Sequence, residues 1–208
     1  LGIGGARVIQ ALNIFPGVLH LNEGHSAFAI LEEVRRVMQA DGISFDNALR
    51  RVSIYTVFTT HTPVPAGHDR FSPELVEEHL GLFREKLNLS HEGFMALGRV
   101  KPDDVNEPFC MTVLALKLAA HTNGVSKLHG VTSRRMWRNL WPELPEEQVP
   151  ITSITNGVHP RTWISHNMID LLDRYLGPQF QEHPEDFEVW EHMDRISDEE
   201  LFRTHERR

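Results

Sequence analysis

Three short polar clusters carry the side chains of this 208-residue sequence that are best suited to chemistry. The clusters are Asn22-Glu23-Gly24-His25, Thr60-His61-Thr62 and Thr155-Asn156-Gly157. Together they offer amide, carboxylate, imidazole and hydroxyl groups with little net charge. Such donors and acceptors suit a polyhydroxylated ligand such as a sugar. The plainer alternative is that Asn22 and Asn156 only supply turn chemistry.

The cluster around His61 has the most distinctive local sequence. The β-branched and aromatic run from Val52 to Thr60 predicts a buried strand. Pro63 and Pro65 follow it, and each proline fixes its own φ and drives the preceding residue toward extended conformations. Because the chain cannot continue directly into a helix, we expect His61 to lie at a rigid rim where the strand ends.

The remaining pattern predicts an α/β protein with Rossmann-like βαβ layers. The predicted strands cover residues 18–21, 52–60 and 151–155, and the main predicted helices cover residues 5–12, 27–40, 44–51, 111–121 and 126–137. In the second of these helices we expect Ser26 as the N-cap and Glu32 in solvent. Parallel strands end at one edge of a sheet, where ligands bind. We therefore expect Asn22, His61 and Asn156 to gather on a common rim facing one ligand.

Three other candidate sites are less specific. Thirteen histidines raise the question of a metal, but His20 and His25 flank a strand end and a glycine and do not share a helix face, so we expect no metal site. The glycines of Gly2-Ile3-Gly4-Gly5 match a dinucleotide fingerprint only in part, because Arg7 replaces the third glycine. Cys110 has apolar neighbours and no evident catalytic partner, which indicates a structural thiol.

Composition argues against several classes of partner and location. A formal net charge of −8 disfavours binding to nucleic acid or to an anionic membrane surface. The longest apolar run is far shorter than the roughly 20 residues of a membrane span. A single cysteine excludes an internal disulfide and fits a cytoplasmic location. The sequence starts inside a glycine-rich apolar stretch and stops within a helical pattern, so we expect an internal fragment of a longer polypeptide.

The polar clusters and their flanks resemble a known family. The matching blocks are Leu1–Gly5, His20–Phe28, Phe58–Asp69, Asn123–His129 and Ile154–His159. They resemble the α-glucan phosphorylases, above all the short bacterial and archaeal branch of glycogen and maltodextrin phosphorylases. The resemblance implies a GT-B glycosyltransferase fold of two Rossmann-like domains. It implies that residues 1–150 form the later half of the N-terminal, glucan-facing domain, and that residues 151–208 cross into the C-terminal domain.

The resemblance also implies a reaction and site roles. The reaction is reversible phosphorolysis of a terminal α-1,4-glucosidic bond by inorganic phosphate, which gives α-glucose 1-phosphate with retention. His61 would reach the 6-hydroxyl of the reacting sugar, and its main-chain carbonyl would lie near the reacting carbon, where positive charge develops. Asn156 would share the 6-hydroxyl, and Val125 would pack on the sugar. Three further residues would line the acceptor side of the glucan channel: Glu23, His25 and Thr62.

The family uses pyridoxal 5′-phosphate and commonly forms homodimers, which the resemblance implies for the parent protein. The cofactor lysine and the basic residues that bind substrate phosphate have no counterpart in this sequence, so we expect the chain to be inactive alone. Animal members carry aspartate at the position of Glu23, which leaves the hydrogen bonding of this residue open. Two alternatives also stay open: a GT-B glycogen or starch synthase that uses a nucleotide sugar, and a non-catalytic carbohydrate-binding protein.

Overall fold

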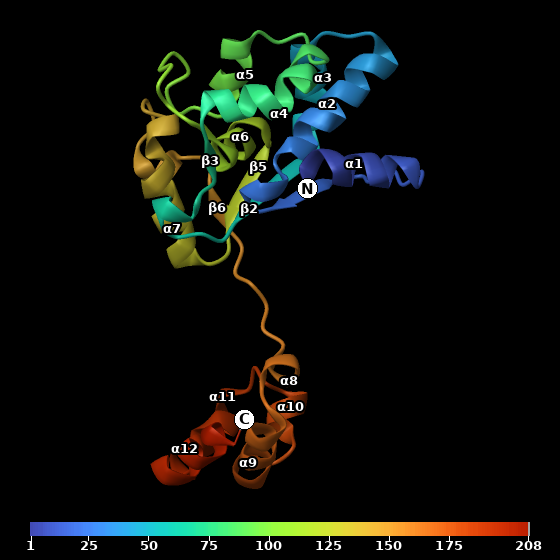
Figure 1. Ribbon diagram of the computed structural model, residues 1–208. Coiled ribbons are helices and arrows are strands. Elements are labelled where there is room, and N and C mark those ends of the chain that lie inside the picture. The colour runs from blue at the N-terminus through green and yellow to red at the C-terminus, as the bar shows by residue number, and fades with distance from the viewer. Residues whose placement is uncertain (208) are drawn as a thin grey trace. The chain divides into compact units, whose positions relative to one another are not determined.

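The computed structural model describes residues 1–207, and its chain divides into two compact units (Figure 1). The first unit is Leu1–Asn156 and the second begins at Gly157. Strands occur in the first unit, and the described part of the second is helical. Among residues 1–207, no helix combines the length and the apolar character that crossing a membrane requires.

The first unit alternates strands and helices along the chain. Its strands are β1 (Leu19–Asn22), β2 (Thr56–Thr60), β3 (Arg70–Phe71), β4 (Phe109–Cys110), β5 (His121–Gly124) and β6 (Thr152–Ser153). Its α-helices are α1 (Gly2–Ala11), α2 (Phe28–Asp41), α3 (Phe45–Ile54), α4 (Pro73–Glu85), α5 (His91–Leu97), α6 (Met111–Leu118) and α7 (Lys127–Trp137). Short 3₁₀ turns are η1 (Gly24–Ser26), η2 (Pro65–Gly67), η3 (Arg138–Leu140) and η4 (Glu146–Gln148).

The main sheet has four parallel strands in the order β1-β2-β5-β6. Asn22 lies opposite Thr59, Thr59 lies opposite Asn123, and Asn123 lies opposite Thr152. A separate antiparallel pair joins β3 to β4. Because the four main strands point the same way, their carboxyl ends lie along one edge of the sheet.

The two faces of the main sheet differ in polarity, as the alternation of side chains along a strand requires. Leu21 and Phe58 point to the buried face. On that side, α6 packs against β2, and α7 packs against β5 and β6. The other face carries His20, Asn22 and His121, which are exposed. Polar side chains are therefore available on the same face of neighbouring strands.

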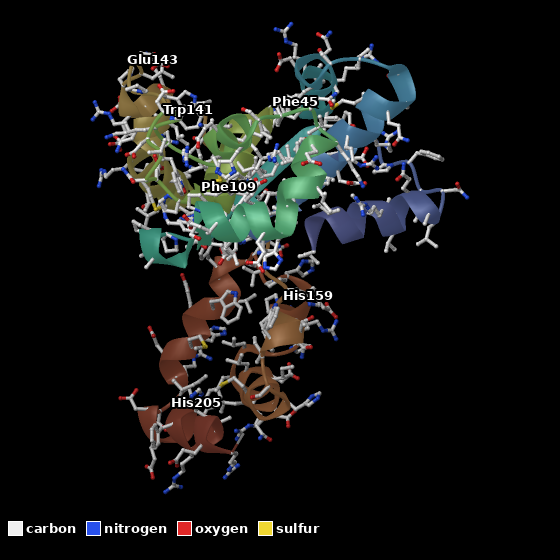
Figure 2. The ribbon with its side chains drawn as sticks, turned by 45° about the horizontal axis from the view of Figure 1, so that its top comes forward. Phe45, Phe109, Trp141, Glu143, His159 and His205 are labelled. Carbon is white, nitrogen blue, oxygen red and sulfur yellow. The ribbon has the colours of Figure 1, made fainter. Side chains whose placement is uncertain are left out.

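Aromatic packing holds the centre of the first unit. The Phe109 ring, labelled in Figure 2, belongs to the first unit. It stacks on Phe28 and on Phe94, with 5.7 Å between ring centroids in each pair. Such offset pairs add about 0.5–1.5 kcal/mol to the free energy gained from burial alone. Cys110 is free and fully buried beside them, which agrees with the expected structural thiol.

A buried arginine organises the loop between α5 and β4. The Arg99 side chain is fully buried, and its guanidinium donates to the carbonyl oxygens of Val105 at 3.1 Å and Glu107 at 2.9 Å. A third hydrogen bond, of 2.8 Å, reaches the carboxylate of Glu92. The Glu107 carboxylate in turn accepts hydrogen bonds from the backbone amides of Val100 and Lys101. The loop therefore has a defined conformation despite its polar sequence.

The second unit is a small group of helices with its own core. Its helices are α8 (Pro160–Trp163), α9 (His166–Leu176), α10 (Gln179–Glu182), α11 (Phe187–Trp190), η5 (Glu191–Arg195) and α12 (Asp198–Glu206). The core is formed by Leu171, Leu172, Leu176, Phe180, Val189 and Ile196. Ser165 and Ser197 cap α9 and α12 by accepting backbone hydrogen bonds, as serine does at helix N-termini.

The strand predictions were wrong in two places. Residues 121–124 form a central strand, β5, where we predicted the end of a helix. The Asn123-Gly124 pair is typical of a turn, but here its backbone pairs with both β2 and β6. The predicted strand at Val52 begins only at Thr56, because the preceding residues complete α3. Strand pairing thus overrides the local turn preference of Asn123-Gly124, whereas the β-branched residues before Thr56 are helical.

Two predictions for the helix after β1 were also wrong. Ser26 belongs to the turn η1, and α2 starts at Phe28 without a side-chain cap. Glu32 is not in solvent: it is 2% exposed. Its carboxylate accepts hydrogen bonds from Arg35 one turn later and from Arg7 on α1. Both cations are needed because a buried carboxylate without partners is strongly unfavourable.

We expect Glu32→Gln to lower the free energy of unfolding by about 1.5–3 kcal/mol, the range for hydrogen bonds to charged groups. Burial raises the pKa of the Glu32 carboxyl, but Arg35 and Arg7 outweigh it and hold the pKa below its ordinary value. The stabilisation is therefore present above the ordinary pKa and is lost as pH falls through the lowered one. Urea unfolding at several pH values measures both effects. Exposed Glu78→Gln is the control, and an equal response in both variants would contradict the assignment.

Candidate functional site

The carboxyl edge of the main sheet brings the three polar clusters of the sequence into line. Asn22 ends β1, and His61 directly follows β2, the neighbouring strand. Val125 follows β5, and the backbone amide of Asn156 donates to its carbonyl oxygen at 3.1 Å. The order along the edge is therefore Asn22, His61, Val125 and Asn156. We call these four residues, together with Glu23, His25 and Thr62, the edge site.

A direct hydrogen bond joins the first two clusters. His61 Nε2 lies 2.5 Å from Asn22 Oδ1. Because an amide oxygen only accepts, the imidazole donates from Nε2. In the neutral imidazole, Nδ1 then carries the lone pair and can accept a hydrogen bond from a hydroxyl group. Asn22 thus fixes the tautomer as well as the orientation of His61.

Glu23 ties the chain after β1 to the loop after β2. Its Oε1 accepts hydrogen bonds from the backbone amide of His61, from the amide of Thr62 at 2.8 Å and from the Thr62 hydroxyl at 3.2 Å. The Thr60 hydroxyl adds a bond of 3.3 Å. Burial raises the pKa of the Glu23 carboxyl, but these donors, led by the His61 amide, outweigh burial and leave the pKa below its ordinary value. The side chain is therefore a carboxylate at neutral pH.

The backbone at Glu23 is strained. Its φ of 70° and ψ of 171° lie in a region that glycine adopts and other residues rarely do. The Glu23 amide continues the ladder by donating to the Thr59 carbonyl at 2.9 Å. Such strain costs about 1–3 kcal/mol and persists only where surrounding contacts over-determine it. The hydrogen bonds of the carboxylate are contacts of that kind.

A polar ladder that sequence reasoning missed lies one step back from the edge. The Thr59 hydroxyl donates to Asn123 Oδ1 at 2.9 Å and lies 2.7 Å from His20 Nε2. Since the hydroxyl hydrogen is used by Asn123, His20 donates to the Thr59 oxygen. The ladder crosses β1, β2 and β5 on the same face as Asn22. The alternation of polar residues in His20-Leu21-Asn22 could have indicated it.

Two buried histidines lie on the elements behind the edge. His68 is 6% exposed, and its Nδ1 lies 2.9 Å from the Thr112 hydroxyl. Burial lowers the pKa of the His68 imidazole. His129, on α7, accepts a hydrogen bond at Nδ1 from the Val125 amide at 3.2 Å. The contact with His129 holds the backbone of the edge site at Val125. His25, in contrast, is exposed.

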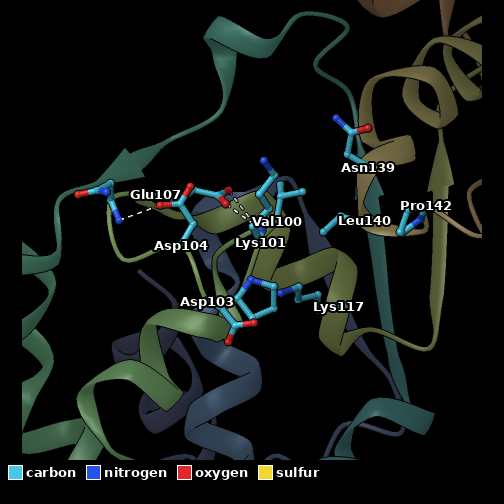
Figure 3. A pocket seen from close by; sticks show the side chains of 11 residues that line it. Val100, Lys101, Asp103, Asp104, Glu107, Lys117, Asn139, Leu140 and Pro142 are labelled. Atoms are coloured by element: carbon cyan, nitrogen blue, oxygen red, sulfur yellow. Dashed lines mark hydrogen bonds between the residues drawn. The ribbon is translucent and has the colours of Figure 1, made fainter.

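The edge site is separate from the wide hollow of about 1290 Å³ shown in Figure 3. Lys117 lines that hollow and lies near the end of α6, the helix before β5. Asn139 also lines it and follows α7, the helix that begins after the carboxyl end of β5. The hollow therefore lies toward the amino ends of the strands. Among residues 1–207, no group of three histidine, cysteine, aspartate or glutamate side chains is arranged to hold a metal ion.

Comparison with known proteins decides the family. A profile of the carbohydrate phosphorylase family matches residues 12–207. The chain belongs to the carbohydrate phosphorylase family. This confirms the resemblance drawn from the sequence blocks. The family has the GT-B glycosyltransferase fold, and the parallel α/β sheet agrees with the predicted fold class.

Several curated relatives of this phosphorylase-family chain cover nearly all of it. It is 43% identical over 205 residues to a maltodextrin phosphorylase of Thermococcus litoralis, 39% identical over 212 residues to a glycogen phosphorylase of Mycobacterium tuberculosis, and 33% identical over 205 residues to a glycogen phosphorylase of Aquifex aeolicus. The matches cover 97–99% of this chain. The chain spans only 24–29% of the length of these relatives.

The edge site does not by itself fit pyridoxal 5′-phosphate, the cofactor of the family. A lysine amine is needed to bind its aldehyde, and cationic groups are needed to bind its phosphate. The seven residues of the edge site include neither lysine nor arginine. Lys117 donates to the carbonyl oxygens of Ala96 at 2.8 Å and Arg99 at 2.5 Å. It lies toward the amino ends of the strands, away from the edge site.

Proposed function

We propose that the chain is the glucan-facing part of an α-glucan phosphorylase that cleaves terminal α-1,4-glucosidic bonds with inorganic phosphate. The observation that carries the proposal is the edge site, whose amide, imidazole and carboxylate groups line one edge of the parallel sheet. Membership of the family and the names of the relatives support it. Residues 1–150 would be the later half of the N-terminal domain, and residues 151–208 would cross into the C-terminal domain.

In the proposed reaction the bond between the anomeric carbon and the glycosidic oxygen breaks, and a bond from that carbon to a phosphate oxygen forms. The glycosidic oxygen takes up the proton that inorganic phosphate gives up, and leaves as the 4-hydroxyl of the shortened glucan. His61 binds the 6-hydroxyl through Nδ1, since Nε2 is held by Asn22. Asn156 binds the same hydroxyl, and Val125 packs on the sugar ring. His25, Thr62 and Glu23 form the acceptor side.

The cofactor and the phosphate-binding cations are proposed to come from other parts of the parent protein. The parent would bind pyridoxal 5′-phosphate, which supplies proton exchange with the substrate phosphate. A homodimer is proposed for the parent on the family resemblance alone. A cytoplasmic location is proposed on the single cysteine, Cys110, which is free and buried. This chain alone would bind glucan without catalysing phosphorolysis.

The test uses the full-length protein that contains this chain. Incubated with maltodextrin and inorganic phosphate, it is expected to release α-glucose 1-phosphate and to show cofactor absorbance. Transfer of glucose from a nucleotide sugar, with no phosphorolysis, would instead support a synthase. Glucan binding with neither reaction would support a non-catalytic carbohydrate-binding protein. Either of those results rejects the proposed function.

A further inference from the structure

The carboxylate of Glu23 is placed to act on the peptide group that follows His61. Thr62 N–H and His61 C=O belong to the same planar peptide and point in opposite directions. Glu23 Oε1 accepts from that N–H at 2.8 Å. The hydrogen bond therefore fixes the plane of the peptide and directs the His61 carbonyl away from Glu23.

The charge of Glu23 also acts on this carbonyl. A carboxylate bound at the N–H end of a peptide polarises it and increases the partial negative charge on the oxygen. The His61 amide hydrogen-bonds to the same Oε1, so both peptides around His61 are held by one atom. In contrast, the side chain of His61 is oriented by Asn22, the residue before Glu23. Consecutive residues at the end of β1 thus orient the two functional groups of His61 separately.

We propose that Glu23 is a positioning residue, whose carboxylate orients and polarises the main-chain carbonyl of His61 toward the reacting carbon of the sugar. The inference rests on the proposed function, in which positive charge develops at that carbon. A preorganised dipole aimed at developing charge lowers the barrier without strengthening ground-state binding. Glu23 therefore acts through His61, in addition to its proposed place in the lining of the acceptor side.

The strained backbone supports this role. Glutamate at a φ of 70° is unfavourable, and glycine would relieve the strain. A residue that served only to turn the chain would be better replaced by glycine. The carboxylate is what glycine cannot supply, and its four hydrogen bonds to residues 60–62 are the contacts that compensate the strain.

The first experiment measures the hydrogen bonds directly in the 208-residue chain. Proton–nitrogen NMR spectra of the chain and of Glu23→Gln would follow the amide protons of His61 and Thr62 as the pH is lowered. Both protons are expected downfield at neutral pH and are expected to move upfield as Glu23 becomes protonated, below the ordinary glutamate pKa. In Glu23→Gln both protons should lie upfield at every pH. Unchanged amide shifts in the variant would overturn the inference, and Glu78→Gln, exposed on α4, is the matched control.

The second experiment measures turnover in the full-length protein. Glu23→Gln is expected to lower kcat about 100-fold, the size of effect produced by a misplacement of about 1 Å, while KM for maltodextrin stays within about twofold. Glu23→Asp, which keeps the charge, should recover part of kcat, and Glu23→Gly, which relieves only the strain, should not. A rise in KM with unchanged kcat would leave Glu23 only its place in the acceptor lining and overturn the inference. Absence of phosphorolysis in the unmodified protein would instead reject the proposed function, whereas the NMR result tests the hydrogen bonds in either case.

Discussion

In the full-length protein, His61→Ala is expected to lower kcat for phosphorolysis by about 10²–10³-fold, the loss that follows removal of one preorganised hydrogen-bonding group at a reacting centre. The physical reason is the position of the imidazole: Asn22 holds Nε2, so Nδ1 is presented to the sugar in one orientation. Interactions at the reacting glucosyl unit strengthen in the transition state, while the rest of the glucan binds elsewhere. Turnover should therefore fall far more than glucan affinity.

The measurement compares kcat from initial rates of glucose 1-phosphate release with the Kd for maltodextrin from calorimetry. His79→Ala is the control, because His79 is exposed on α4 and outside the edge site. Asn22→Ala should give a smaller loss of kcat in the same direction, since it frees the imidazole without removing it. Weaker glucan binding with unchanged turnover in His61→Ala would refute the role of His61.

The second large effect is expected on stability. Arg99→Met should lower the free energy of unfolding of the first unit by about 3–5 kcal/mol, because two hydrogen bonds from a buried charged donor are lost. The methionine fills much of the volume but leaves the carbonyl oxygens of Val105 and Glu107 without donors. Each hydrogen bond from a charged donor contributes about 1.5–3 kcal/mol. The freed Glu92 carboxylate contributes little because it is 58% exposed.

Urea unfolding of the 208-residue chain, followed by circular dichroism, measures this loss. Arg135→Met is the matched control, since that side chain is exposed and pairs with Glu146 only at 3.5 Å. Its effect should stay within about 0.5 kcal/mol, as for surface ion pairs. Hydrogen exchange should also accelerate across residues 100–107 in Arg99→Met. Similar stabilities of the two variants would show that the buried guanidinium does not hold this loop.

The sequence allowed the edge of the sheet to be predicted, but not the full strand pairing or the hydrogen bonds between the side chains at that edge. Strand ends at Asn22 and Thr60 follow from apolar runs that stop in polar residues, and the parallel arrangement follows from helices between the strands. β5 could not be found this way, because Asn123-Gly124 reads locally as a turn and becomes a strand only through its two neighbours. The position of β5 is set by its pairing with segments that are distant in the sequence.

The same limit applies to single side chains. Glu32 lies on α2 beside other charged residues, and only the approach of Arg7 from α1 makes its burial favourable. Glu23 could be recognised as a carboxylate near the site, but its four donors come from residues 60–62, nearly forty positions away. A sequence shows which groups are present, and the fold determines which of them are already engaged with each other.

The pairing of β1 with β2 also constrains how this region can vary in length. Side chains alternate between the two faces of a strand, so one residue inserted or deleted between Leu19 and Asn22 would turn the Asn22 amide toward the core and a leucine toward His61. Homologous sequences should therefore differ here by substitution, and their gaps should fall in connections such as residues 12–18 or 142–150. A library that samples insertions along the chain would map the edge as a segment of fixed spacing.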